Sequence, residues 1–111
     1  MSLIFACATA VAVDGDTLRC ANIEEANGRV RLARIDAPEM RTPEGPIAKR
    51  ALQAMLTDDV RCQQVDADPR IAGFQEHDRY GRIVAYCRIG ERGHDLGRRM
   101  VRAGLAKRWP S

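Results

Sequence analysis

The stretch that decides the fold is VDGDTLRCANIEEANGRVRLARID, residues 13–36. It contains two turn dipeptides, Asp14-Gly15 and Asn27-Gly28, and each is a strong hairpin signal when β-prone residues flank it. The strands expected on either side of these turns are residues 5–13, 16–23 and 29–36. The pattern therefore predicts a three-stranded meander over the first third of the chain.

The rest of the chain predicts a helix, two strands and a second helix. Prolines at positions 38, 43 and 46 interrupt regular secondary structure and predict a loop. Thr42 is the expected N-cap of the helix that follows, with Pro43 at the first helical position. Apolar residues at three-and-four spacing follow, as in an amphipathic helix. The expected elements are a helix at 43–56, strands at 59–68 and 82–90, and a helix at 95–109 that Asp95 caps and Gly104 ends. This order, βββ-α-ββ-α, predicts an α+β, mainly β, fold: an OB-fold with a partly open, five-stranded Greek-key barrel and two helices.

Composition narrows the class of protein. A chain of 111 residues suits a single domain spanning residues 1–111. Its apolar runs fall short of the roughly 18 residues that a membrane helix needs, so we expect no membrane partner. We also expect the protein to be a monomer. The formal charge of +3 is weak evidence for an anionic partner, and the alternative is a solvated arginine-rich surface.

The four cysteines leave two alternatives, disulfides or buried thiols. Without a C-x-x-C pair, a structural zinc site is not expected. We favour Cys62–Cys87, because the two late strands should be neighbours. The pair Cys7–Cys20 lies on a diagonal and needs a bulge or a shifted turn. Disulfides favour a periplasmic or secreted protein whose leader is absent from this chain, since residues 1–13 lack a basic n-region. A cytoplasmic location also stays open.

Several carboxylates stand at strand ends. Asp16 follows the first turn, and Asp36 and Glu39 flank a kink at Pro38 that fixes where the Ala37 carbonyl points. A rigid kink with two carboxylates favours a cation between them, and Ca²⁺ takes carboxylates, carbonyls and waters. The alternative is that Asp16 and Glu39 are ordinary turn and helix-entry residues.

Basic residues accompany these carboxylates. On a regular strand, Arg31, Ala33 and Ile35 share one face, and Leu32, Arg34 and Asp36 share the other. An arginine directed into a small barrel needs a phosphate or carboxylate partner. Arg82 follows a Tyr80-Gly81 turn at the mouth of the fifth strand. Asp78 and Tyr80 are expected to shape this loop, and His77 and His94 to be exposed loop residues.

Four segments together carry a family resemblance: VDGDTLR (13–19), VRLARIDAPE (30–39), DRYGRIVAY (78–86) and LGRRMVRAGLA (96–106). From about Ala10 to Lys107, the chain resembles the staphylococcal-nuclease-like, or thermonuclease, family. The resemblance implies an OB-fold, Ca²⁺-dependent nuclease. It would cleave DNA and RNA, preferably single-stranded, with little sequence specificity, breaking the 5′-oxygen–phosphorus bond and leaving 3′-phosphate ends.

The resemblance also implies roles for individual residues. Asp16 and Asp36 would bind Ca²⁺ through their carboxylates, and Ala37 through its main-chain carbonyl. Glu39 would orient or deprotonate the attacking water. Arg31 and Arg82 would act in catalysis by holding the phosphate, and Tyr80 would contact substrate. Longer members carry a third helix and an aromatic-bearing segment after the second helix, and Trp109 lies out of register with that pattern. A catalytically weak or inactive OB-fold nucleic-acid-binding module, or a purely structural barrel, is the alternative.

Overall fold

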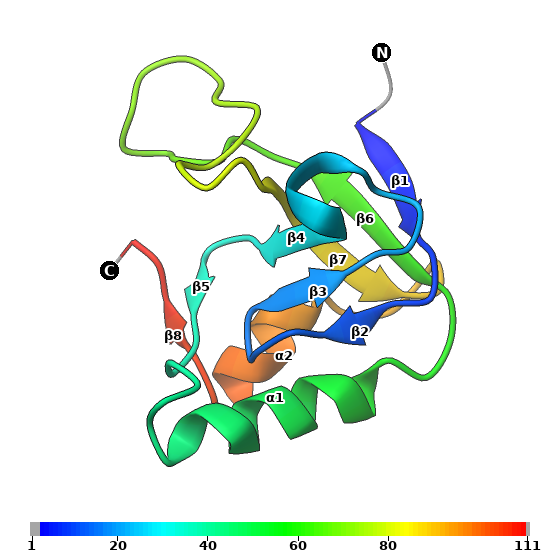
Figure 1. Ribbon diagram of the computed structural model, residues 1–111, viewed down its shortest axis with the longest axis vertical. Coiled ribbons are helices and arrows are strands. Elements are labelled where there is room, and N and C mark those ends of the chain that lie inside the picture. Colours follow the sequence, from blue (N-terminus) through cyan, green and yellow to red (C-terminus); the bar gives the residue numbers. More distant parts are fainter. Residues whose placement is uncertain (1–2, 111) are drawn as a thin grey trace.

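The computed structural model describes residues 3–110, which form eight short strands, two α-helices and one 3₁₀ helix (Figure 1). The strands are β1 (Ile4–Cys7), β2 (Val11–Ala12), β3 (Thr17–Arg19), β4 (Arg29–Leu32), β5 (Ile35–Asp36), β6 (Val60–Gln64), β7 (Ile83–Ile89) and β8 (Lys107–Arg108). The helices are η1 (Glu25–Gly28), α1 (Glu44–Met55) and α2 (Leu96–Arg102).

Six strands form one mixed sheet in the order β1-β6-β7-β4-β3-β2, in which β4 and β7 run parallel. β1 and β2 lie at opposite edges although only residues 8–10 separate them, so the sheet is strongly curled but is not a closed barrel. An open arrangement agrees with the predicted partly open barrel, but the predicted number of five strands is corrected to six in this sheet. The physical reason is a kink at Thr9, whose φ of 49° divides the expected strand 5–13 and sends β1 to pair with β6.

A second kink divides the expected strand 29–36. Arg34 has a φ of 65°, so β4 ends at Leu32 and β5 leaves the main sheet to pair with β8. The predicted alternation of faces is therefore wrong beyond Leu32: Leu32, Ala33 and Ile35 are all buried, whereas Asp36 is exposed. This break turns the end of β5 toward the hairpin that carries Asp16.

The first helix begins without the predicted cap. Pro43 occupies the N-cap position and no side chain caps the helix. The Thr42 hydroxyl instead donates to the Glu39 carbonyl over 2.7 Å, which closes the turn that precedes the helix. Thr42 thus fixes the backbone at Glu39 rather than the end of α1.

The predicted N-cap of the second helix, Asp95, and its predicted end at Gly104 are both confirmed. The Asp95 carboxylate accepts the Arg98 N–H over 2.8 Å, and Gly104 has a φ of 75°. The N–H groups of Gly104 and Leu105 donate to the carbonyls of Val101 and Met100, which is a Schellman ending. The residues after Gly104 form β8 rather than a continuation of the helix. No helix among residues 3–110 is long and apolar enough to cross a membrane.

The core lies between the curled sheet and the two helices, which pack against each other at its lower side in Figure 1. Among the described residues, six Leu, Val and Met side chains are essentially inaccessible to solvent. They are Leu18, Val30, Leu32, Leu52, Leu96 and Met100. These residues come from β3, β4, α1 and α2, so the hairpin that carries Asp16 is anchored in the core from its strands.

All four cysteines are paired. Cys62 and Cys87 are direct cross-strand partners in β6 and β7, with Cα atoms 4.0 Å apart. Cys7 and Cys20 are joined with Cα atoms 4.8 Å apart. The irregularity that this pair needed is the break in the strand at Thr9, which has a φ of 49°. The Ala21 N–H donates to the Ala8 carbonyl over 2.8 Å, so the residues that follow the two cysteines lie side by side. The favoured pairing and the conditional one are both confirmed.

Removing the Cys62–Cys87 bridge should lower the free energy of unfolding. The bridge closes a loop with a sequence separation of 25, for which the chain-entropy model gives roughly 3–4 kcal/mol. The measurement is urea unfolding of the Cys62→Ala/Cys87→Ala protein beside the unaltered one. The Cys7→Ala/Cys20→Ala protein, with a separation of 13, should lose about 3 kcal/mol. Free thiols titrated under denaturing, non-reducing conditions would contradict the pairing.

Candidate functional site

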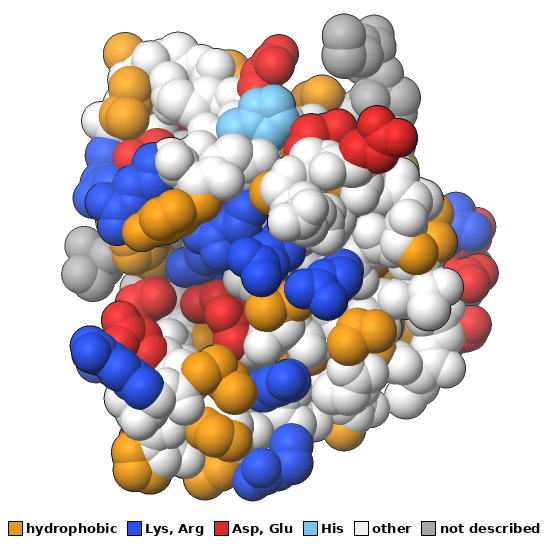
Figure 2. All heavy atoms as spheres, in the orientation of Figure 1, with side chains coloured by type: hydrophobic (Ala, Val, Ile, Leu, Met, Phe, Trp, Pro, Cys, Tyr) orange, Lys and Arg blue, Asp and Glu red, His pale blue; other side chains and the backbone are white. Residues whose placement is uncertain are grey.

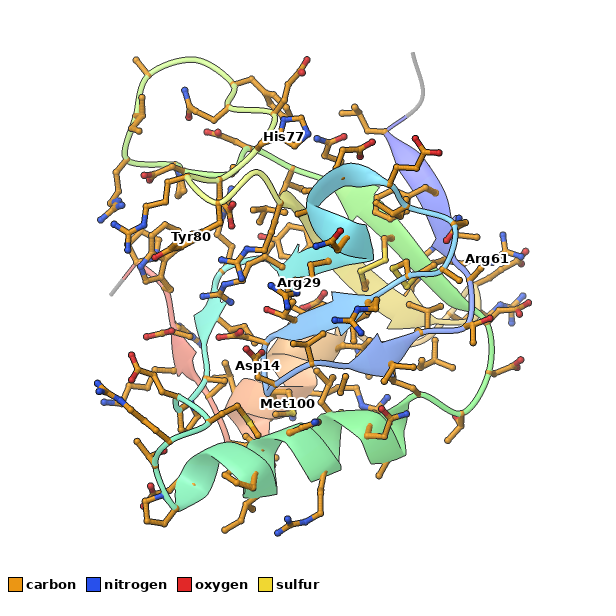
Figure 3. The ribbon with its side chains drawn as sticks, viewed as in Figure 1. Asp14, Arg29, Arg61, His77, Tyr80 and Met100 are labelled. Atoms are coloured by element: carbon orange, nitrogen blue, oxygen red, sulfur yellow. A yellow bond between two sulfur atoms is a disulfide. The ribbon has the colours of Figure 1, made fainter. Side chains whose placement is uncertain are left out.

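Asp16 is a buried carboxylate at the tip of the β2–β3 hairpin, with 7% of its surface exposed. Its Oδ2 accepts the Ala37 N–H over 2.8 Å and lies 3.1 Å from Arg31 Nη1. Its Oδ1 accepts the Thr17 hydroxyl over 3.2 Å. Asp14, labelled at the hairpin tip in Figure 3, accepts the Asp16 N–H as in an Asx turn. The prediction that Asp14 is a turn residue is confirmed, and this turn positions the backbone of Asp16.

Burial raises the pKa of Asp16 to about 6, because the charged carboxylate loses its hydration. The positive charge of Arg31 lowers the pKa, but by less, while Asp14 raises it further. One arginine therefore does not fully compensate the buried charge. Burial at this place therefore favours the protonated carboxyl more than Arg31 favours the charged one.

Gly15 is needed here for close approach. A Cβ on Gly15 would lie 2.7 Å from the Cβ atoms of both Ala37 and Ala48, closer than packed side chains come. Its φ is not in the left-handed region, so the Asp14-Gly15 signal reflects packing rather than turn geometry. The absent side chain allows the hairpin tip to sit against β5 and α1, which brings Asp16 to Ala37.

Arg31 joins the two predicted metal-binding carboxylates. Its Nη1 contacts Asp16, and its Nη2 lies 3.6 Å from Asp36 Oδ1. The Arg31 side chain is largely buried, with 18% exposed, whereas that of Asp36 is 62% exposed. The structure thus brings Asp16, Arg31, Asp36 and Ala37 together at one place.

Arg82 is held beside this group by Asp78. The Asp78 carboxylate accepts Arg82 Nε over 2.7 Å and the Arg82 backbone N–H over 2.9 Å. Arg82 Nη1 reaches the Thr17 hydroxyl over 3.5 Å, and Thr17 in turn bonds Asp16. Asp78 also accepts the Tyr80 N–H, so the prediction that it shapes the loop is confirmed. Tyr80 is exposed, and its ring stacks against the guanidinium of Arg82.

Both arginines line one cavity of about 430 Å³. Arg34, Arg70 and Arg79 line it as well, together with Trp109. Figure 2 shows this face as a band of basic side chains with a group of acidic ones directly below it. The volume is that of a small-molecule site, and guanidinium groups are suited to phosphate.

Glu39 stands apart from this cluster. Its side chain is 67% exposed and pairs with Arg41 over 2.6 Å, rather than with Arg31 or Arg82. Its backbone is fixed, because Thr42 donates to its carbonyl and Gly45 packs against that carbonyl without room for a side chain. The structure therefore sets where Glu39 leaves the chain, close to Asp36, but leaves its carboxylate in solvent.

The candidate ligand atoms at this place are the carboxylate oxygens of Asp16 and Asp36 and the Ala37 carbonyl oxygen, and oxygen ligands suit a hard cation. His77 and His94 are exposed, and neither bonds to Asp16 within residues 3–110. In the part of the chain that the structure describes, no three Asp, Glu, His or Cys side chains meet closely enough to hold a metal by themselves. Asp16 and Asp36 would therefore need a backbone carbonyl and waters to complete a coordination shell, a combination that Ca²⁺ accepts.

Three functional candidates were not predicted from the sequence. Thr17 is buried and connects Asp16 to Arg82, although a threonine in a strand gave no signal of its own. Arg70 comes from the loop between β6 and β7, and Trp109 directly follows β8; both line the arginine-rich cavity. The backbone N–H of Trp109 donates to the backbone carbonyl of Arg34, and this bond positions the residue. Only the three-dimensional fold connects these segments.

The fold and this site define a nuclease-type or nucleic-acid-binding module. The family model for staphylococcal nuclease homologues matches residues 29–110. The chain belongs to this family, whose domain is an OB-fold and whose members are in general nucleases. Among curated proteins, none matches the chain. Asp16 precedes the matched range, yet it contacts Arg31 and Ala37 within it.

Proposed function

We propose that this protein is a Ca²⁺-dependent nuclease that hydrolyses phosphodiester bonds of DNA and RNA with little sequence specificity. One observation carries the proposal: Arg31 bridges the carboxylates of Asp16 and Asp36 and lines the same cavity as Arg82. Two carboxylates and two arginines thus lie side by side, and guanidinium groups are suited to phosphate. We also propose a periplasmic or secreted location, which the two disulfides support.

The arginines in this proposal bind the scissile phosphate. Arg31 uses Nη1 for Asp16 and for the Leu32 carbonyl, and its Nη2 lies 3.6 Å from Asp36 Oδ1. A phosphate bound here would therefore share Nη2 with Asp36 or accept from Nε. Arg82 uses Nε for Asp78, and its Nη2 has no partner within residues 3–110. Both can donate to the non-bridging oxygens as negative charge develops there, and each such donor is worth roughly 10²–10³ in rate.

Asp16, Asp36 and the Ala37 carbonyl would hold Ca²⁺ in this proposal. Bound there, the cation would supply positive charge for the developing phosphoryl oxygens and help to position water. Glu39 takes the proton from the attacking water while the 5′-oxygen leaves and is protonated from solvent. This leaves a 3′-phosphate on the other fragment.

Glu39 must first release Arg41. Both side chains are mostly exposed, and an exposed ion pair is worth only about 0–1 kcal/mol. Replacing the ion pair between Glu39 and Arg41 by a hydrogen bond from Glu39 to water would therefore add little to the catalytic barrier. The exposed position of Glu39 also gives specific support to the second candidate function, a nucleic-acid-binding module with weak catalysis or none.

Cleavage of single-stranded DNA should require both Ca²⁺ and Glu39. With chelator present, we expect the unaltered protein to show no turnover above background. With Ca²⁺, Glu39→Gln should lower kcat by about 10²–10⁴-fold, because the general base is lost. The measurement is release of fragments from an end-labelled oligonucleotide.

A matched control distinguishes loss of the general base from loss of a negative charge near the site. Glu44→Gln removes an exposed carboxylate from the first turn of α1 and should leave the rate within about threefold. Equal rates with Ca²⁺ and with chelator would contradict the metal dependence. Binding without turnover in every condition would establish the non-catalytic module instead.

A further inference from the structure

A second cavity, of about 350 Å³, lies across the β5–β8 pair from the arginine-rich cavity, and α2, β5, β7 and β8 contribute to its lining. Figure 1 shows β5 and β8 side by side. Arg108 lines the second cavity, whereas Trp109, the next residue, lines the first. Arg34 and Ile35 line both cavities. The two cavities are therefore neighbours, with this pair of strands between them.

Basic side chains dominate the second cavity. Its four arginines are Arg34, Arg98, Arg102 and Arg108, and the last three are exposed. Among the described residues of its lining, Asp95 is the only acidic one, and its carboxylate accepts the backbone N–H groups of Arg98 over 2.8 Å and Cys87 over 3.1 Å. Within residues 3–110, none of the three exposed arginines forms an ion pair. The second cavity thus carries positive charge that the chain itself does not neutralise.

The positions of two of these arginines are not explained by the stability of α2. Arg98 is the third residue of the helix, and the positive end of the helix dipole disfavours a cation in the first turn. Arg102 follows four residues later, and like charges at this spacing destabilise a helix. Only the place of Arg102 in the last turn is favourable. An anion bound in the second cavity would compensate the arrangement.

The backbone of a nucleic acid fits this charge. Guanidinium groups bind phosphate through paired N–H donors, and three exposed arginines can hold more than one phosphate. Because Arg34 lines both cavities, a single polyanion can extend from one to the other. An acidic polypeptide would also neutralise the arginines, but it would have no reason to continue into a cavity where a phosphodiester is cleaved.

We propose that the second cavity binds the phosphate backbone of the substrate away from the scissile bond, through Arg98, Arg102 and Arg108. This inference rests on the proposed function for the identity of the strand. A long substrate would be held at two places, whereas a dinucleotide would reach only the arginine-rich cavity. The consequence is a lower KM for long substrates without a change in the chemical step.

Binding is measured with chelator present, so that cleavage is suppressed. The probe is a labelled single-stranded oligonucleotide of about 16 nucleotides, the upper site size of one OB-fold. Arg98→Gln/Arg102→Gln/Arg108→Gln should lower the steepness of log Kobs against log salt by about 2, at roughly 0.7 for each lost phosphate contact. Between about 50 and 200 mM salt, the unaltered protein should therefore lose about 20-fold more affinity than this variant.

A matched variant, Arg50→Gln/Arg61→Gln/Arg92→Gln, removes the same charge from elsewhere. In the described structure these three arginines are exposed and line neither of the two cavities. Its salt dependence should change by less than about 0.7. Urea unfolding should show the second-cavity variant to be at least as stable as the unaltered protein, because repulsion along α2 is relieved. A less stable variant would assign the arginines to the fold and count against the proposal.

Cleavage separates this inference from the proposed function. With Ca²⁺, the second-cavity variant should raise KM for the same oligonucleotide by at least about 20-fold at about 50 mM salt, while kcat is kept. With a dinucleotide substrate, both constants should stay within about threefold of those of the unaltered protein. An equal loss on the dinucleotide would overturn the proposal, because it would place these arginines in the catalytic step.

The second site is also overturned by equal salt dependence of the two triple variants, or by the lack of any oligonucleotide binding. Labelled polyglutamate that binds as tightly as the oligonucleotide, with the same sensitivity to the second-cavity variant, would assign the cavity to an acidic polypeptide instead. Ca²⁺-dependent cleavage with unchanged KM in that variant would leave the proposed nuclease standing and remove only the second site. Oligonucleotide binding that depends on the second cavity, without cleavage in Ca²⁺, would do the reverse.

Discussion

Asp16→Asn is expected to make the folded protein more stable while it removes cleavage. The buried carboxylate has a pKa of about 6, so at neutral pH the fold carries a charge that it solvates poorly. The asparagine amide has nearly the same shape and no charge. From the pKa difference, we expect a gain of roughly 1–3 kcal/mol in the free energy of unfolding in chelator. Loss of a proposed Ca²⁺ ligand should lower kcat/KM by more than about 10²-fold. This loss exceeds the usual effect of replacing a residue that only hydrogen-bonds to a metal ligand.

The sign of the pH dependence follows from the raised pKa. In the folded chain Asp16 is protonated below about pH 6, whereas the unfolded chain gives up this proton at its ordinary, lower pKa. The penalty for charging Asp16 is therefore complete above about pH 6 and fades as the pH falls toward 4. Urea unfolding of both proteins between pH 4 and 7.5 should show the advantage of Asp16→Asn shrinking in this window.

Asp59→Asn provides the control, because Asp59 is an exposed carboxylate before β6. Its stability and activity should match the unaltered protein within about 0.5 kcal/mol and about threefold. A less stable Asp16→Asn protein at pH 7 would show that Asp16 supports the fold. An Asp16→Asn protein with full activity would remove Asp16 from the metal site.

Local turn and helix signals predicted much of the architecture. The order of the elements, the cap at Asp95 and the stop at Gly104 follow from side chains that act on their own backbone. The two strand breaks could not be predicted in this way. Left-handed backbone is expected at Gly or Asn, but here it occurs at Thr9 and Arg34. Contacts made elsewhere in the fold hold these two residues in that conformation.

The strand break at Arg34 has consequences for the site. A regular strand would have placed Asp36 on the face of Leu32, whereas the kink separates them and directs Asp36 to Arg31. The same kink exposes backbone that β8 pairs with, and this pairing carries Trp109 to the cavity. β8 could not be predicted, because a two-residue strand forms only where its distant partner is available.

The structure brings most of the predicted site residues together, but the ion pairs among them were not predicted. Arg31 was expected to need a phosphate or a carboxylate, and the structure gives it two carboxylates. Glu39 was placed by a proline kink that fixes the backbone but not the side chain, and its carboxylate lies in solvent with Arg41. Sequence motifs specify which residues are brought near one place. The ion pairs that they form depend on side-chain conformation.

Arg82→Lys should lower kcat by about 10²–10³-fold with little change in KM. Lysine keeps the charge but loses the planar fork, so it cannot bond Asp78 and reach Thr17 and a phosphate oxygen together. Arg79→Lys is the matched control, since Arg79 lines the same cavity but bonds only the exposed Tyr80. It should stay within about threefold of the unaltered rate.

Asp78 should act through Arg82, and a double-mutant cycle can show this. Asp78→Asn leaves the guanidinium without its charged anchor, and a displacement of about 1 Å at a reacting group is enough for a loss of up to about 10²-fold in kcat. In the Arg82→Lys background the fork is already absent, so Asp78→Asn should then lower kcat by less than about threefold. Single-turnover cleavage of a labelled oligonucleotide by the four proteins gives the coupling. Equal, multiplicative losses in the two backgrounds would mean that Asp78 supports the loop of Tyr80 and not the position of Arg82, because only a shared partner makes the two substitutions redundant.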